Sequence, residues 1–300
     1  MKVFSKKRIA VLCVICLFAC MVSGFTTPAA GTNADALAAP VTVTSTVVQQ
    51  HAESTVPVYL NGIKAADGTA LGDTVYMPIA AFYDAAGIQA DIVRDEATGT
   101  VTVTAEGLSL KAADGQKYVT VNDRCFYLAD GLQNLGGEAA LPVRILAGSL
   151  QYTVAWDAES ASVSLAADDP LPLASADATY NAEDLYWLSH LINAEAGNQP
   201  FEGKVAVGNV VLNRVADPSC PNSVHDVVFD NFGVQFSVIT TGGIYAEPNE
   251  ESLAAAKACL EGASVVGKAL YFVNPTLASS KWFDQTRTFI ATIGEHDFYA

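Results

Sequence analysis

Basic side chains are scarce in this sequence. Its 300 residues include 16 lysines and arginines against 32 aspartates and glutamates, which gives a formal net charge of −16. Proteins that bind nucleic acids neutralise phosphates with many basic residues. The acidic balance therefore excludes a protein that binds nucleic acid through its charge.

Histidine is also rare, which limits the metal chemistry open to the chain. There are four histidines, and none lies between residues 52 and 189. His190, His225 and His296 form no HExxH motif, and the five residues from His190 to Glu195 do not place both on one helix face. The sequence thus argues against a zinc peptidase or amidase, and we expect no metal and no other cofactor.

Long apolar runs are confined to the N-terminus. Four basic residues within the first eight precede the run IAVLCVICLFACMVSGF, an order typical of a signal peptide. We predict a signal peptide over residues 1–38, cleaved near Ala38, and export from the cytosol. The alternative is an uncleaved N-terminal anchor, although the run is slightly shorter than the roughly 20 residues that span a bilayer.

Cysteine is sparse in the chain beyond residue 38. Only Cys125, Cys220 and Cys259 remain there, and 12 basic against 31 acidic residues leave a net charge of −19. In an exported protein, three cysteines permit one disulfide and one free thiol. We predict a bond between Cys220 and Cys259.

The length and the composition indicate two folded domains. Three hundred residues exceed an ordinary single domain, and 51% hydrophobic residues with 16% charged residues indicate well-filled cores. Turn-forming and proline-rich stretches set the expected boundaries. We predict a leader at 39–55, a first domain at 56–166, a linker at 167–179 and a second domain at 180–300. Nothing in the sequence indicates whether the protein forms oligomers.

The first domain contains an internal repeat. Segments starting at Met77 and Leu141 share an apolar residue before proline, a short helix, an aliphatic strand, a turn with aspartate and an alternating strand. Asp95 and Asp157 correspond at the turns. We predict a β-rich domain made of two helix-plus-hairpin units that bury their apolar faces together.

This layout resembles the copper amine oxidase N-terminal-like domain, with VPVYLNG at Val56 as the opening strand. The family name suggests copper, but the ligands that copper favours are absent apart from Cys125. We therefore interpret the domain as a non-catalytic module, with wall association as a hypothesis.

An acid interrupts the apolar face of the first helix predicted in the second domain. Asn181 marks the expected start of this helix and Gly197 its end. Leu188 and Leu191 follow at helical spacing, and a further step of three or four residues leads to Glu195.

A carboxyl in apolar surroundings holds its proton unusually well, because low polarity disfavours the charged form. Cleavage of a glycosidic bond requires such a protonated acid near neutral pH. An ion pair between Glu195 and a base such as Arg214 is the other interpretation, and the spacing alone favours it.

The next helix is predicted to begin with Pro200 in its first helical position. It is apolar nearly all round, except for a polar stripe of Glu202, Asn209 and Asn213. The two asparagines either hydrogen-bond neighbouring loops or line a polar groove, and the pattern leaves both open.

Motifs of the second domain, taken in order, resemble the SleB-type cell wall hydrolases. INAEAGNQPFEGKVAVGNVVLNRV is followed by DPSCPNSVHDVVF, QFS, PNEESLAAAKACLEG, ALYFVNP and IGEHDFYA. The resemblance implies a mainly helical, lysozyme-related α+β catalytic domain with a small antiparallel sheet. It also implies an exported enzyme that cleaves peptidoglycan glycan strands in the vegetative wall or, during germination, in the spore cortex.

The resemblance assigns catalysis to Glu195 of the Ala-Glu-Ala motif. In a lytic transglycosylase, Glu195 would protonate the oxygen that leaves N-acetylmuramic acid and then accept a proton from the 6-hydroxyl, which closes a 1,6-anhydro ring. His296 is expected to be structural, and Gln199 stands where many relatives have glutamate. The candidate substrate-binding residues are Glu202, Asn213, Gln235, Phe236, Ser237, Tyr271, Asn274 and Trp282.

Other functions remain open at this point. A hydrolytic muramidase or glucosaminidase would need a second acid about 5 to 9.5 Å from the first, and Glu202 is the nearest candidate. An amidase is a further alternative. A peptidase using Cys220 and His225 is disfavoured, since Pro221 follows the cysteine and no third group orients the pair. A protein of another class would keep the fold and bind the wall without cleaving it.

Overall fold

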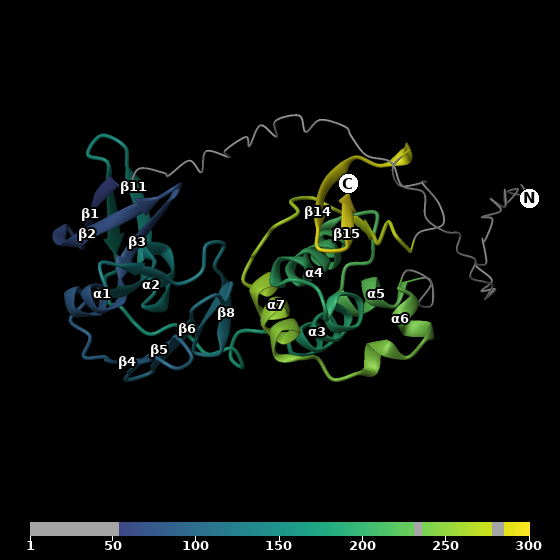
Figure 1. Cartoon of the computed structure of the whole chain (residues 1–300), viewed down its shortest axis with the longest axis horizontal. Coiled ribbons are helices and arrows are strands. Elements are labelled where there is room, and N and C mark those ends of the chain that lie inside the picture. The colour runs from purple at the N-terminus through teal and green to yellow at the C-terminus, as the bar shows by residue number, and fades with distance from the viewer. Residues whose placement is uncertain (1–53, 231–235, 278–284) are drawn as a thin grey trace, which may run out of the picture. The chain divides into compact units, whose positions relative to one another are not determined.

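The computed structural model describes residues 54–230, 236–277 and 285–300 (Figure 1). The predicted signal peptide lies outside these residues, as does all of the predicted leader except its last two residues. The described residues all belong to one compact unit. Within the described part of this unit, no helix combines the length and apolar character needed to cross a membrane.

The N-terminal part of the unit is rich in strands. Its helices are α1 (Ile79–Ala85) and α2 (Val143–Ser149). Its strands are β1 (Ser54–Leu60), β2 (Ile63–Leu71), β3 (Thr74–Pro78), β4 (Asp91–Asp95), β5 (Thr100–Ala105), β6 (Leu108–Ala113), β7 (Tyr118–Val121), β8 (Arg124–Tyr127), β9 (Gln133–Leu135), β10 (Glu138–Pro142), β11 (Thr153–Asp157) and β12 (Ser162–Ala166).

These strands form two sheets. The larger sheet has the order β11-β12-β1-β2-β3-β10-β9, with β1 and β12 parallel, and the smaller one is the antiparallel meander β4-β5-β6-β7-β8. Val101 and Val103 of β5 share one buried cluster with Val163 and Leu165 of β12. Alternate side chains of a strand point to one face, so the two sheets bury their apolar faces in a common core.

The internal repeat is present in this part of the structure. Helix α1 precedes the hairpin β4–β5, and α2 precedes the hairpin β11–β12. In the first hairpin Arg94 lies opposite Val101, and in the second Trp156 lies opposite Val163. Arg94 and Trp156 therefore occupy equivalent positions in the two copies.

The C-terminal part is mainly helical. Its helices are α3 (Ala182–Ala196), α4 (Phe201–Ala216), α5 (Val224–Val228), α6 (Ser237–Thr240), the 3-10 turn η2 (Gly243–Tyr245) and α7 (Glu250–Leu260). Strands β13 (Tyr271–Val273), β15 (His296–Tyr299) and β14 (Phe289–Ile293) form a small antiparallel sheet in that order. The predicted α+β class is thus confirmed.

Polar caps set where two of these helices begin, and the cap at Asn181 is the one predicted above. The Asn181 side chain accepts hydrogen bonds from the backbone N–H groups of Glu183 and Asp184, and Ser223 caps α5 through Asp226. The prediction for α4 is one residue off, because Pro200 precedes the helix and Phe201 is its first residue.

Helices α3, α4 and α7 pack closely around one core. Leu188, Leu191 and Val207 in it are fully buried. Gly208 lies where α4 meets its neighbours, and a Cβ there would come within 2.6 Å of Cys259 Sγ and 2.9 Å of Ile192 Cδ1. The absence of a side chain at Gly208 allows this close helix packing.

The predicted Cys220–Cys259 disulfide is wrong, because both cysteines are free thiols. Cys259 lies in the helical core, where its thiol donates to the Val205 carbonyl oxygen. Cys220 instead lines a small cavity with Arg214 and Leu270. Sequence separation and an oxidising compartment do not determine whether two cysteines meet in space.

Residues before and after the predicted linker are in contact within the unit. Arg124 of β8 donates from Nε and Nη2 to the two carboxylate oxygens of Glu261, both at 2.6 Å. The Tyr118 ring stacks on Phe201 at 5.0 Å. Such bidentate and aromatic contacts tie strands β7 and β8 to the helical part.

Candidate active site

A groove of about 480 Å³ opens on the helical part of the molecule. Its walls come from segments far apart in the sequence, namely the end of α3, the last turn of α4, the start of α6, strand β13 and the turn from β14 into β15. Polar side chains from several of these segments converge in the groove beside the apolar Phe236, Phe272, Val273 and Leu277, and a concave site with convergent polar groups is typical of ligand binding. The groove is therefore the candidate active site.

Glu195 lies in this groove, in the last turn of α3. Burial raises the pKa of its carboxyl from the ordinary 4.5 to about 7. Glu195 has no hydrogen-bond or ion-pair partner among the described residues. The carboxyl therefore keeps its proton in a large fraction of molecules at neutral pH, which is the state a general acid needs.

Arg214 lines the same groove but is engaged elsewhere. Its Nε donates to the Leu270 carbonyl oxygen at 2.7 Å, and its guanidinium lies 5.4 Å from the Phe236 ring centre and 5.5 Å from that of Tyr271. The ion pair of Glu195 with Arg214, which the spacing favoured, is wrong. Arg214 instead supplies a partly buried positive charge to the groove wall.

Gln199 links the segment after α3 to the turn between β14 and β15. Its side-chain oxygen accepts the Glu295 backbone N–H at 2.9 Å, and its carbonyl oxygen accepts from Lys204 Nζ at 2.5 Å. Gly294 has a φ of +60°, and a Cβ there would overlap the Gln199 amide. The glutamine that replaces a glutamate thus fixes the turn carrying Glu295 next to the end of α3.

Two titratable residues of the groove were not predicted to belong to it. Glu295 brings a second carboxyl to the groove, and Asn274 donates to it over 3.4 Å. His296, expected to be structural, also lines the groove, its Nδ1 buried without a partner among the described residues. The only signal in the sequence is their place in the motif GEHDFYA, because their proximity to Glu195 depends on the tertiary fold.

Several candidate substrate-binding residues do come together with Glu195. Phe236, Ser237 and Asn274 all line the groove. Tyr271 does not line the groove but lines the small cavity that also contains Arg214, and its hydroxyl accepts from Arg287 at 3.1 Å. Gln235 and Trp282 lie outside the described residues.

Glu202 and Asn213 lie elsewhere. Glu202 faces Lys117 of the β-rich part at 3.9 Å. Asn213 donates to the carbonyl oxygens of Gly267 and Ala269 at 2.8 and 2.9 Å. The polar stripe of α4 thus hydrogen-bonds neighbouring loops, one of the two interpretations that its pattern allowed.

No cluster of three or more histidine, cysteine, aspartate or glutamate side chains is placed to hold a metal ion within residues 54–230, 236–277 and 285–300. The polar groups that line the groove in this part of the chain are two carboxyls, a guanidinium, an imidazole, side-chain amides and the Ser237 hydroxyl. This set suits proton transfer and hydrogen bonding to a polar, uncharged substrate.

Family models match two separate regions of the chain. Residues 60–165 match the copper amine oxidase N-terminal domain, and residues 198–299 match the Cell Wall Hydrolase family. Glu195 lies just before the second match. Both predicted resemblances are confirmed.

Curated relatives match over 119 residues, or 40% of this chain. A spore cortex-lytic enzyme of Bacillus cereus is 38% identical and one of Bacillus subtilis is 36% identical. The match covers 45% and 38% of these relatives, so the chain spans less than half of their length. Among solved structures, the catalytic domain of the germination-specific lytic transglycosylase SleB from Bacillus anthracis is 36% identical, with a TM-score of 0.38, over 41% of this chain and 98% of that one.

Proposed function

Because residues 198–299 belong to the Cell Wall Hydrolase family, we propose that this protein is an exported enzyme that cleaves the glycan strands of peptidoglycan. We further propose that it cleaves between N-acetylmuramic acid and N-acetylglucosamine as a lytic transglycosylase. The curated relatives named as spore cortex-lytic enzymes support the substrate class. The observation that carries the proposal is the partly buried carboxyl of Glu195 in the groove, which has no hydrogen-bond or ion-pair partner among the described residues.

In the first step, protonated Glu195 donates its proton to the glycosidic oxygen as the bond to the muramic acid carbon breaks. A pKa near 7 balances the fraction of protonated enzyme against the ease of proton release. The low polarity that raises this pKa also strengthens the interaction of the new carboxylate with the positive charge that develops on the sugar.

In the second step, the Glu195 carboxylate accepts the proton of the muramic acid 6-hydroxyl, whose oxygen bonds to the sugar carbon and closes the 1,6-anhydro ring. The enzyme regains its starting protonation state, so neither a nucleophile nor a metal is consumed. Phe236, Ser237 and Asn274 would contact the sugars, and His296 Nδ1 would hydrogen-bond one of them.

Glu295 favours a second candidate, a hydrolase of the same bond. A hydrolase uses a second carboxyl to activate water or to attack the sugar. Glu202, the second acid suggested by the sequence, does not line the groove, whereas Glu295 does. The two candidates differ in their products.

The test is mass spectrometry of peptidoglycan digested in ¹⁸O-labelled water. The proposal predicts 1,6-anhydromuramic ends without label, and new reducing ends carrying ¹⁸O would establish the hydrolase instead. Glu195→Gln should abolish both products. Glu202→Gln, which changes a glutamate outside the groove, is the matched control and should digest like wild type. Equal digestion by the two variants would refute the role of Glu195.

A further inference from the structure

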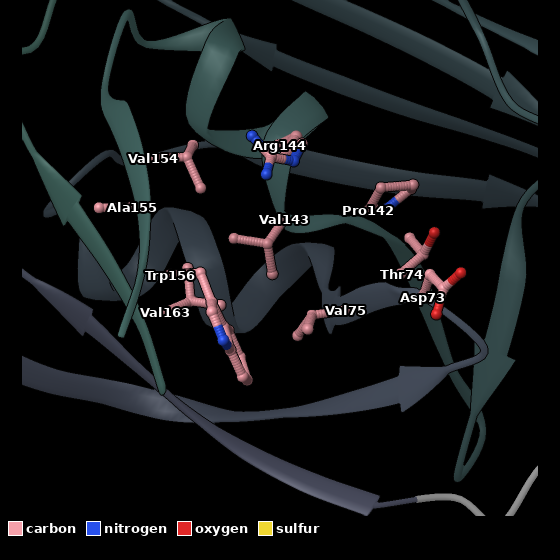
Figure 2. Close-up of a pocket in the computed structure, with 10 residues that line it drawn as sticks. All are labelled: Asp73, Thr74, Val75, Pro142, Val143, Arg144, Val154, Ala155, Trp156 and Val163. Carbon is pink, nitrogen blue, oxygen red and sulfur yellow. The ribbon is translucent and has the colours of Figure 1, made fainter. Parts of the chain in front are cut away.

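The β-rich part carries a pocket that the proposed reaction does not use. Its volume is about 180 Å³, and it is lined by residues of β3, α2, β11 and β12. Val75, Val143 and Val163 give it an apolar floor. Figure 2 shows Val143 at its centre, with Trp156 on one side and Asp73 on the other.

Trp156 forms one wall of this pocket and is more exposed than most tryptophans. Its side chain is 52% exposed, and its indole stacks on no aromatic ring in the described part of the chain. An indole combines a large apolar face with an N–H donor, and exposed apolar faces that line a pocket mark binding sites. The flat face suits the apolar face of a sugar ring.

Polar groups of both charge signs lie at the rim. Arg144 and Asp73 are both exposed, and neither has an ion pair or hydrogen bond with another described residue. One strong donor and one acceptor beside an apolar floor fit an uncharged polar ligand. The pocket is smaller than the roughly 300 Å³ at which sites for drug-sized ligands begin, so it suits a single sugar unit.

The two copies of the internal repeat carry different residues at the positions that line this pocket. In the first copy, Arg94 stands in place of Trp156 and forms an ion pair with Asp114 at 2.5 Å. Ala80 stands in place of Arg144, two residues after the proline shared by both copies. Both copies fold with the same layout, so neither Trp156 nor Arg144 is needed for it, and both line one pocket.

We propose that this pocket binds one N-acetylated amino sugar of a glycan strand. Trp156 stacks on the pyranose ring, and the acetyl methyl contacts Val143 and Val163. Arg144 donates to a carbonyl or hydroxyl oxygen, and Asp73 accepts a hydroxyl proton. The identification of the strand as peptidoglycan rests on the proposed function. The pocket would then hold the enzyme on the wall while the groove cleaves it.

The test uses the full chain carrying Glu195→Gln, which prevents digestion during the binding assay. The probes are soluble N-acetylglucosamine trimer, followed by calorimetry, and sacculi stripped of stem peptides, followed by co-sedimentation. Adding Trp156→Ala or Arg144→Ala should weaken binding to both probes by about tenfold, or 1.4 kcal/mol. Val93→Ala removes part of a side chain with a similar 53% exposure outside the pocket and should change nothing. Thermal melts of all variants should coincide.

Unchanged binding in the Trp156→Ala and Arg144→Ala chains would overturn this inference, as would binding that requires the stem peptides. If Trp156→Ala lowers the melting temperature, Trp156→Phe, which keeps a ring for stacking, must retain most of the affinity. The proposed function can be refuted independently of this inference. If the wild-type chain does not digest glycan strands but its binding still depends on Trp156, the proposed reaction is refuted and the sugar-binding pocket is retained.

Discussion

Replacing Glu195 with glutamine should stabilise the protein above neutral pH. The folded state holds this proton up to about pH 7, whereas an unfolded chain releases it near 4.5. Between these values the unfolded state binds fewer protons, so the contribution of Glu195 to stability is full below pH 4.5 and is lost as pH rises through 7. Glutamine has nearly the same shape and cannot ionise.

The size of this effect follows from the two pKa values. Their difference, at 1.36 kcal/mol for each pKa unit, corresponds to about 3 kcal/mol. This is an upper value, because the side chain is partly exposed and water screens its charge. A gain of this size would mean that the chain gives up stability to keep an acid in the groove.

Urea unfolding followed by circular dichroism at pH 4, 6 and 8 measures the effect. Glu195→Gln should match wild type at pH 4 and exceed its free energy of unfolding at pH 8, by at most about 3 kcal/mol. Glu202→Gln, which removes a charge that faces Lys117 outside the groove, is the control and should gain no stability over wild type at pH 8. If Glu195→Gln and wild type differ by the same amount at all three pH values, the carboxyl is not desolvated and the reasoning fails.

Three further predictions concern the mainly helical C-terminal part. Gly208→Val should cost about 2 kcal/mol in urea unfolding, because a side chain there overlaps Cys259 and Ile192; unchanged stability would contradict the close packing of the helices. Gly294→Ala should slow glycan cleavage and destabilise the fold by about 1 to 2 kcal/mol, since alanine disfavours a φ of +60° and would displace Gln199 and Glu295; full activity would show that this turn does not position the groove. A reducing agent should leave the melting temperature unchanged, because Cys220 and Cys259 are not bonded, and a clear decrease would contradict this.

Local features of the fold were predictable because they depend on short-range chemistry. Asn181 and Ser223 cap helices with their own side chains, and the repeat shows itself in a fixed order of proline, apolar and aspartate residues. Helical spacing also placed Glu195 on an apolar face. These features involve residues a few positions apart, where geometry is set by the backbone.

The composition of the site was less predictable because it depends on which distant segments meet. Helical periodicity put Glu202 and Asn213 on one stripe but did not reveal which residues contact it. In the structure, Glu202 faces Lys117 and Asn213 donates to backbone carbonyl oxygens. Glu295 reaches the groove through a turn held by Gln199, a contact between residues far apart in the sequence. The disulfide prediction was wrong for the same reason, because the sequence does not give the distance between two thiols.

The pH dependence of glycan cleavage tests the central claim most directly. The claim is that Glu195 must carry a proton to start the reaction, with a pKa raised by burial to about 7. On soluble glycan fragments, kcat/KM should therefore be flat below this pH and fall about tenfold per pH unit above it. A profile that stays flat up to pH 9, or one that falls already from an ordinary carboxyl pKa of 4.5, would contradict the account.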